Sequence, residues 1–107
     1  MTPELEVFIK NSVHYFEVSI EWVKSAHRLI EVVLRKNKLK APLVNSLRRD
    51  VKYKIVEFNQ KSDFVYDGIV WGKIPMEILN GDYVEKSDVL QVELKALRER
   101  LDSIVIL

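Results

Sequence analysis

The chain has 107 residues, a formal net charge of +1 and no cysteine. This length predicts a single domain over residues 1–107. The absence of cysteine excludes a disulfide framework, a thiolate zinc site and thiol catalysis. The segment from Met1 to Glu4 has no basic stretch leading into an apolar run, so it does not resemble a signal peptide. Charged residues interrupt every long apolar stretch, and we therefore expect no membrane-spanning segment and a cytoplasmic protein.

A long amphipathic helix is predicted in the N-terminal third of the sequence. Apolar side chains repeat every seven residues along one line of this helix: Ile9, Phe16, Val23 and Ile30. A second line of apolar and small side chains runs beside the first: Phe8, Ser12, Tyr15, Ser19, Trp22, Ala26, Leu29 and Val33. Thr2 can cap this helix and Pro3 suits its first position. The pattern predicts a helix from about residue 3 to about residue 36, with at least two neighbours packed on its wide apolar arc.

A second helix is predicted after a short break between Asn37 and Pro42. Because the break is short, this helix should fold back antiparallel to the first and form a long helical hairpin with it. Its apolar stripe has helical spacing: Val44, Leu47, Val51, Ile55 and Phe58. Val65 would extend the stripe by one further heptad through Ser62.

Residues 64–71 admit two interpretations. Asp67-Gly68 stands between two runs of apolar, aromatic and β-branched residues, which is typical of a β-hairpin. In the alternative, the second helix ends near Tyr66, Gly68 caps it, and residues 69–74 cross the end of the bundle.

A third long helix is predicted in the C-terminal segment, after a short helical turn between Pro75 and Gly81. A capping box formed by Asp82 with Glu85, or by Asp88 with Gln91, would open this helix. Apolar residues then step by four and three: Leu90, Leu94, Leu97, Leu101 and Ile104. The last four residues, 104–107, are all apolar, which predicts that this end is buried in this chain or in another.

These patterns together predict a mainly α protein. We expect a helical bundle with coiled-coil-like seams, built on the long antiparallel helical hairpin and completed by the C-terminal helix. A small β-hairpin near residues 64–71 is the principal departure that the sequence allows.

Positive charge is concentrated between residues 35 and 54, where only one acid, Asp50, is present. The bases of this segment are Arg35, Lys36, Lys38, Lys40, Arg48, Arg49, Lys52 and Lys54. In an antiparallel hairpin they would lie at one end of the bundle, as the focused patch that a nucleic acid or another polyanion requires. A solvated helix face explains the same charges, and only Tyr53 offers a ring on which a base could stack.

No arrangement of residues indicates catalysis. His14 and His27 are 13 positions apart on one predicted helix and cannot share a metal ion. His27 lies in an apolar seam, where a histidine is more often hydrogen-bonded within the core. No nucleophile, base and orienting group can be assembled from the remaining residues. We therefore predict a protein that is not an enzyme and has no metal, cofactor or small-molecule substrate.

The apolar seams exceed what a chain of this length would cover internally, which favours a homo-oligomer or a protein partner. Trp71 either plugs the open end of the bundle, which burial favours, or anchors an interface. We predict a non-enzymatic protein-interaction module, such as an adaptor, an inhibitor or a regulatory subunit. Nucleic-acid binding through residues 35–54 is the alternative. The predicted interface residues are Trp71, Leu90, Leu94, Leu97, Leu101, Ile104 and Leu107.

Overall fold

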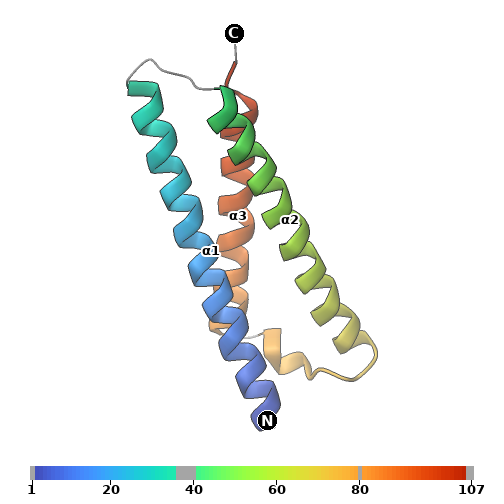
Figure 1. The fold of residues 1–107 in the computed structure, drawn as a ribbon. Helices are drawn as coiled ribbons and strands as arrows, with labels where there is room; N and C mark the ends of the chain where they lie inside the picture. The colour runs from blue at the N-terminus through green and yellow to red at the C-terminus, as the bar shows by residue number, and fades with distance from the viewer. Residues whose placement is uncertain (1, 36–40, 80, 106–107) are drawn as a thin grey trace.

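Helices make up nearly all of the computed structural model of this chain (Figure 1). They are α1 (Pro3–Arg35), α2 (Ala41–Val70), the short 3-10 helix η1 (Met76–Leu79) and α3 (Asp82–Asp102). The structure describes residues 2–35, 41–79 and 81–105. The prediction of a mainly α, bundle-like protein is therefore confirmed.

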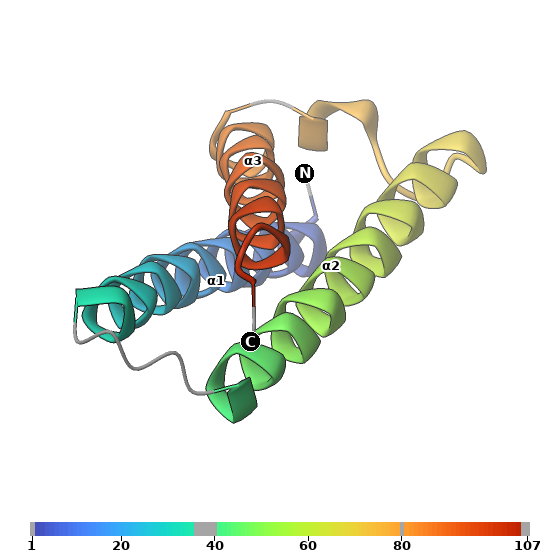
Figure 2. The same cartoon turned by 90° about the horizontal axis from the view of Figure 1, so that it is seen from above.

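The three long helices lie side by side, with α1 and α3 running in one direction and α2 in the opposite direction (Figure 1). α3 packs against both other helices, whereas α1 and α2 diverge from one another (Figure 2). The bundle measures 53 × 20 × 17 Å and has a radius of gyration of 16.7 Å. A compact chain of this size would have a radius of gyration of about 13 Å. The molecule is therefore elongated, and α3 is the element that joins the other two helices.

The core follows the predicted periodicity. On α1 the buried residues include Phe16, Val23 and Ile30 of the first apolar line. The Phe16 ring lies 6.1 Å from the ring of Phe58 on α2 and 5.3 Å from that of Tyr83 on α3, measured between centroids. These three rings bring α2 and α3 to α1, but α1 packs closely along α3 only, so the prediction that the bundle is built on the α1–α2 hairpin is not confirmed.

The two predicted helix starts have different outcomes. The Thr2 hydroxyl accepts a hydrogen bond of 3.2 Å from the Leu5 amide, so the predicted cap of α1 is confirmed. For α3 the predicted capping box is wrong, because the N-cap is Gly81 with φ 65° and no side chain caps the helix. Asp82 and Glu85 lie instead in the first turn, where their charges complement the helix dipole.

The predicted β-hairpin near residues 64–71 is also wrong, because α2 continues through Val70 and no strand occurs in the described segments. Gly72 ends the helix with φ 72°. Its amide donates to the Ile69 carbonyl at 3.1 Å, and the Lys73 amide donates to the Gly68 carbonyl at 2.8 Å. These two bonds form a Schellman motif, which satisfies the last carbonyls of a helix when a glycine follows it.

Gly68 therefore lies inside α2 and does not cap it, contrary to the second interpretation. A Cβ atom at this position would collide with the Ile74 side chain. The glycine lets Ile74 pack directly on the helix backbone after the chain has turned back. The glycine of the Asp67-Gly68 pair is therefore explained by its contact with Ile74 and not by a hairpin turn.

The apolar C-terminal end is only partly buried where the structure describes it. Ile104 is half-buried, but Val105 is 70% exposed, so the prediction can hold for Val105 only through burial in another chain. Residues 106 and 107 lie outside the described residues.

Candidate interaction surface

The leucine seam of α3 is internal core. Leu90, Leu94, Leu97 and Leu101 are each at most 2% exposed. Because α3 lies between α1 and α2, both helices cover its apolar side. The prediction that this seam forms an interface with another chain is therefore corrected. Of the other predicted interface residues, Ile104 is half-buried and Leu107 lies outside the described residues.

Trp71 is 77% exposed and does not plug the end of the bundle, so the interpretation that burial favoured is wrong. It follows the last residue of α2, at the point where the Schellman motif redirects the chain. Ile78 of η1 is buried at that end of the molecule instead (Figure 1). The large ring of Trp71 thus remains available to another molecule.

Arg48 does not belong to a free basic patch. Its Nε and Nη2 atoms donate to the Leu101 carbonyl at 3.2 and 2.9 Å, and Nη2 also donates to the Ile104 carbonyl at 2.8 Å. A positive group at the C-terminal end of a helix satisfies its unpaired carbonyls and complements its dipole. Arg48 therefore attaches the end of α3 to α2, and its predicted role in binding a polyanion is corrected.

Lys54 is likewise engaged within the chain. Its Nζ atom lies 5.6 Å from the centroid of the Trp22 ring and 5.8 Å from that of the Tyr15 ring. One heptad further along α2, the Lys61 Nζ atom lies 4.7 Å from the Tyr15 ring centroid. These cation–π contacts connect α2 to the second apolar line of α1.

The rest of the predicted polyanion patch is scattered. Arg35 and Lys52 are exposed, and the Arg49 Nε atom lies 3.9 Å from an Asp50 carboxylate oxygen. The remaining three predicted bases lie outside the described residues: Lys36, Lys38 and Lys40.

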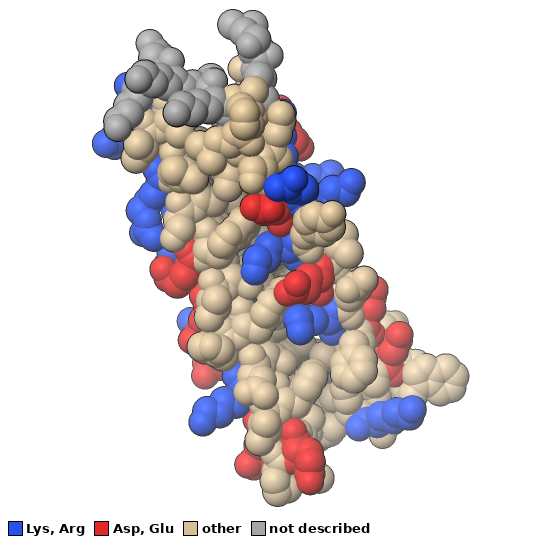
Figure 3. Space-filling view, viewed as in Figure 1, with Lys and Arg blue, Asp and Glu red and all other residues tan. Residues whose placement is uncertain are grey.

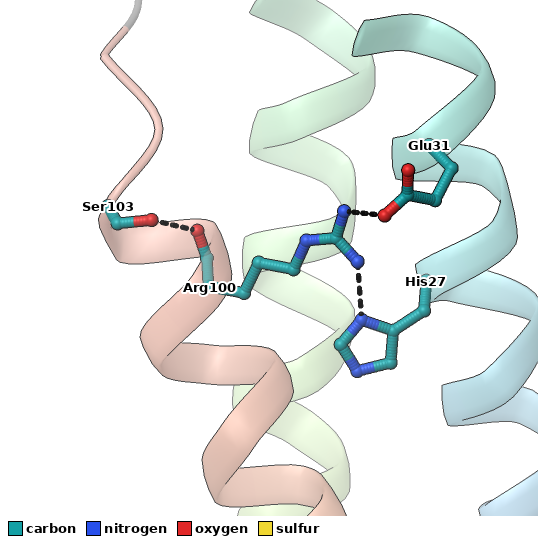
Figure 4. Close-up of polar contacts among 4 residues, drawn as sticks. All are labelled: His27, Glu31, Arg100 and Ser103. Carbon is teal, nitrogen blue, oxygen red and sulfur yellow. Dashed lines mark hydrogen bonds and ion pairs between the residues drawn. The ribbon is translucent and has the colours of Figure 1, made fainter. Parts of the chain in front are cut away.

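Arg100 of α3, with His27 and Glu31 of α1, forms a polar clamp between these two helices (Figure 4). Arg100 of α3 reaches toward α1, where its guanidinium lies 2.9 Å from His27 Nδ1 and forms an ion pair with Glu31. The Ser103 hydroxyl donates to the Arg100 carbonyl at 2.7 Å. His27 is half-buried and hydrogen-bonded, as expected for a histidine in an apolar seam.

The groove between α1 and α2 is lined by aromatic rings and charges, and we call it the α1–α2 surface. Its α1 side carries Phe8, Tyr15 and Trp22, and its α2 side carries Lys54, Glu57, Lys61 and Phe64. We call Asp50, Lys54, Glu57 and Lys61 the charged row of α2, and Tyr53 and Phe64, with Trp71 directly after the helix, the aromatic row. Figure 3 shows acidic and basic side chains alternating down this face of the molecule.

The aromatic rows meet at one end of this surface. The Phe8 and Phe64 rings lie 6.1 Å apart, and both line a depression of about 290 Å³ between α1 and α2. Tyr53 and Phe64 are nevertheless 68% and 63% exposed, because the diverging helices leave this side of α2 uncovered.

Tyr15 is the most perturbed titratable group on the α1–α2 surface. Burial raises the pKa of its phenol above the ordinary value, and the neighbouring Glu57 carboxylate raises it further. Within the described residues, neither the Tyr15 hydroxyl nor the buried Ser19 hydroxyl has a hydrogen-bond partner. Tyr15 is therefore held in its neutral form between two helices.

The sequence contained a signal for this surface. Six positions on α2, and position 71 directly after it, step by four and three residues as the apolar seams do: 50, 54, 57, 61, 64, 68 and 71. This second seam of α2 is mostly polar, so a search for apolar periodicity misses it.

Other classes of site are not evident in the part of the chain that the structure describes. No group of three or more potential ligand side chains is placed to hold a metal ion. None of the described helices combines the length and the apolar character needed to cross a membrane. Comparisons with protein-family models, curated proteins and solved structures give no match for this chain.

Proposed function

We infer that this protein is a non-enzymatic interaction module that associates with a second copy of itself through the α1–α2 surface. The observation that carries this proposal is the exposed aromatic row of α2. Tyr53 and Phe64 of α2, and Trp71 directly after it, are each at least 63% exposed. Exposed aromatic rings that cluster on one face are typical of protein interfaces.

The apolar area is sufficient for a weak or moderate dimer. Fully buried aromatic side chains each remove roughly 150–250 Å² from water. About two thirds of that area is still exposed on the three rings of the row, which leaves roughly 300–500 Å². The half-buried rings of Phe8, Tyr15 and Trp22 add to it on the α1 side. A standard interface buries roughly 800 Å² on each partner, so the exposed rings supply roughly half of one.

The experiment is sedimentation equilibrium of the full chain at concentrations from one to a hundred micromolar. We expect a dimer that dissociates when Tyr53, Phe64 and Trp71 are all changed to Ser. The matched control is Val92→Ser, which removes a 65% exposed apolar side chain from α3. Circular dichroism should show unchanged helicity in both variants. A wild-type chain that stays monomeric throughout contradicts the proposal.

Nucleic-acid binding remains the alternative function, and it now depends on fewer side chains. Lys52 lines a groove of about 510 Å³ between α2 and α3 with Arg98, but Asp102 lies in the same groove. The test is fluorescence anisotropy of labelled duplex DNA and single-stranded RNA at two salt concentrations. Salt-sensitive binding that is lost in the Arg49→Glu, Lys52→Glu double variant would support this alternative.

A further inference from the structure

We propose that the charged row of α2 pairs with the same row of a second copy in an antiparallel, two-fold arrangement. This inference rests on the proposed function and specifies the geometry of that dimer. The row has one acidic or basic side chain at each of four seam positions, spaced by four, three and four residues: Asp50, Lys54, Glu57 and Lys61. Lys54 and Lys61 lie over a ring of α1, Glu57 lines the depression between α1 and α2, and Asp50 precedes them at the same helical spacing.

The order of the signs is what makes the row self-complementary. Along α2 the charges read negative, positive, negative, positive. In the reverse direction they read positive, negative, positive, negative. When two copies of α2 run antiparallel, Asp50 therefore meets Lys61 of the second copy, and Lys54 meets Glu57 of the second copy. Each contact occurs twice, as a two-fold axis requires.

Other alignments are unfavourable. A parallel pairing in register places each charge opposite an identical charge, which is destabilising. A shift of the antiparallel alignment by one heptad brings together fewer pairs of opposite sign. Charge complementarity thus selects one direction and one register, and it selects a second copy as the occupant of the surface.

The charges in the centre of this row lie against aromatic side chains of α1, with Lys54 and Lys61 over the Tyr15 ring and Glu57 beside the Tyr15 phenol. No ion pair within the described residues involves Lys54, Glu57 or Lys61, although their helical spacing allows such pairs. Asp50 has only the long contact with Arg49, and both side chains are about half exposed or more. The lysine ammonium groups lie over the rings of α1 and Glu57 is exposed, so opposite charges of a second copy can approach them.

The aromatic row lies beside the charged row on α2. In the antiparallel register, the Tyr53 and Phe64 rings of each copy border the paired charges and exclude water from them. An ion pair is worth more where its surroundings exclude water. The aromatic row therefore supplies apolar area to the dimer, and the charged row sets the register of its two α2 helices.

The experiment is a charge-swap test with two variants of the full chain, Glu57→Lys and Lys54→Glu. In either variant alone, the two central pairs of the dimer become like-charged, and we expect the dimer dissociation constant to rise at least about tenfold. An equimolar mixture restores opposite charges at both pairs, so we expect a heterodimer with nearly wild-type affinity. Sedimentation equilibrium measures all three samples, and circular dichroism confirms that each variant is folded.

The outer pair provides a second, independent set. Lys61→Glu and Asp50→Lys should repel singly and associate when mixed, and Asp50→Lys leaves the lysine contacts with the rings of α1 in place. The matched controls are Asp63→Lys and Lys52→Glu, which make the same charge changes on exposed positions elsewhere on α2. Both controls should dimerise as the wild type does.

The outcomes separate this inference from the proposed function. A wild-type dimer that tolerates each single swap, or that mixing does not restore, overturns the antiparallel pairing and leaves self-association intact. A wild-type monomer overturns both. Loss of association in the single variants with recovery in the mixture supports both.

Discussion

The two interfaces of α1 differ sharply, although both involve seams of the same helical spacing. Toward α3, α1 meets a row of leucines, and the helices pack closely around Phe16, Val23 and Ile30. Toward α2, it meets a row of charges, and the contacts are made by lysine side chains over aromatic rings. An aliphatic row allows close packing of two helices, whereas long charged side chains hold them apart.

This difference explains why the α1–α2 surface remains accessible. α1 has one apolar line that is buried from Phe16 to Ile30 and a second line whose rings are only half-buried. The second line is bordered by charges that retain contact with water. A second copy of the chain could therefore bind there without disturbing the first interface.

The largest expected effect is on the close-packed side. Leu97→Ala removes a side chain that is fully buried beneath α1 and α2. Replacing a buried leucine by alanine costs roughly 2–5 kcal/mol in the free energy of unfolding. Urea denaturation followed by circular dichroism measures this loss, and Val92→Ala on the exposed side of α3 should change stability by less than about 0.5 kcal/mol. Equal effects of the two substitutions would contradict the assignment of the leucine row to the core.

Arg48→Ala should be the next most destabilising change. It removes three hydrogen bonds from a guanidinium to the C-terminal carbonyls of α3, and we expect a loss of roughly 1.5–3 kcal/mol. Arg49→Ala is the matched control, because the adjacent side chain is 66% exposed and its contact with Asp50 is long. Thermal unfolding of both variants should show a clear decrease for Arg48→Ala only. Arg48→Lys should recover only part of the loss. Its ammonium group restores a positive donor at the end of α3, but it cannot reproduce the planar fork of the guanidinium.

Stability should fall at alkaline pH because of Tyr15. Its folded pKa is raised above the ordinary value, mainly by burial and then by Glu57. Above pH 10 the unfolded chain releases this proton while the folded chain retains it, so the free energy of unfolding decreases as pH rises. The slope from this residue is at most about 1.4 kcal/mol per pH unit, and the contribution is fully present below pH 10.

Urea denaturation at pH 9, 10 and 11 tests this dependence. Tyr15→Phe should reduce the alkaline slope, and Tyr83→Phe should reduce it independently, because burial raises the pKa of Tyr83 as well. An alkaline slope that is the same in Tyr15→Phe as in the wild type would show that this phenol is not held neutral by the fold.

Periodicity in the sequence was sufficient to predict the core. The line through Phe16 and Val23 on α1 and the leucine row of α3 are buried as their spacing indicates. What periodicity does not indicate is which chain covers a seam. The leucine spacing predicts an external partner as readily as an internal one, because the sequence alone does not place α3 between the other two helices.

Contacts between distant residues could not be predicted. Arg48 binds carbonyl groups that lie 53 and 56 residues away along the chain, and no local pattern indicates them. Asp67-Gly68 has the local signature of a hairpin, but the glycine instead makes room for Ile74. In both cases the determining contact is tertiary. For Arg48 no local signal exists, and for Asp67-Gly68 the local signal predicts a turn that the tertiary contact overrides.

The smallest expected effect concerns the lysines between α1 and α2. Lys61→Met keeps an apolar stem over the Tyr15 ring but removes the charge that lies 4.7 Å from its centroid. An exposed cation–π contact contributes roughly 0.5–1 kcal/mol, so we expect a decrease in stability near the lower value.

Lys95→Met on the exposed side of α3 is the control for removing a charge without a ring beneath it. If Lys61→Met is the more stable protein instead, apolar packing would suffice between α1 and α2, and the charge at position 61 would be retained for a contact outside the monomer. Measuring the dimer dissociation constant of the same variant distinguishes these roles, because the proposed pairing with Asp50 of a second copy predicts weaker association in either case.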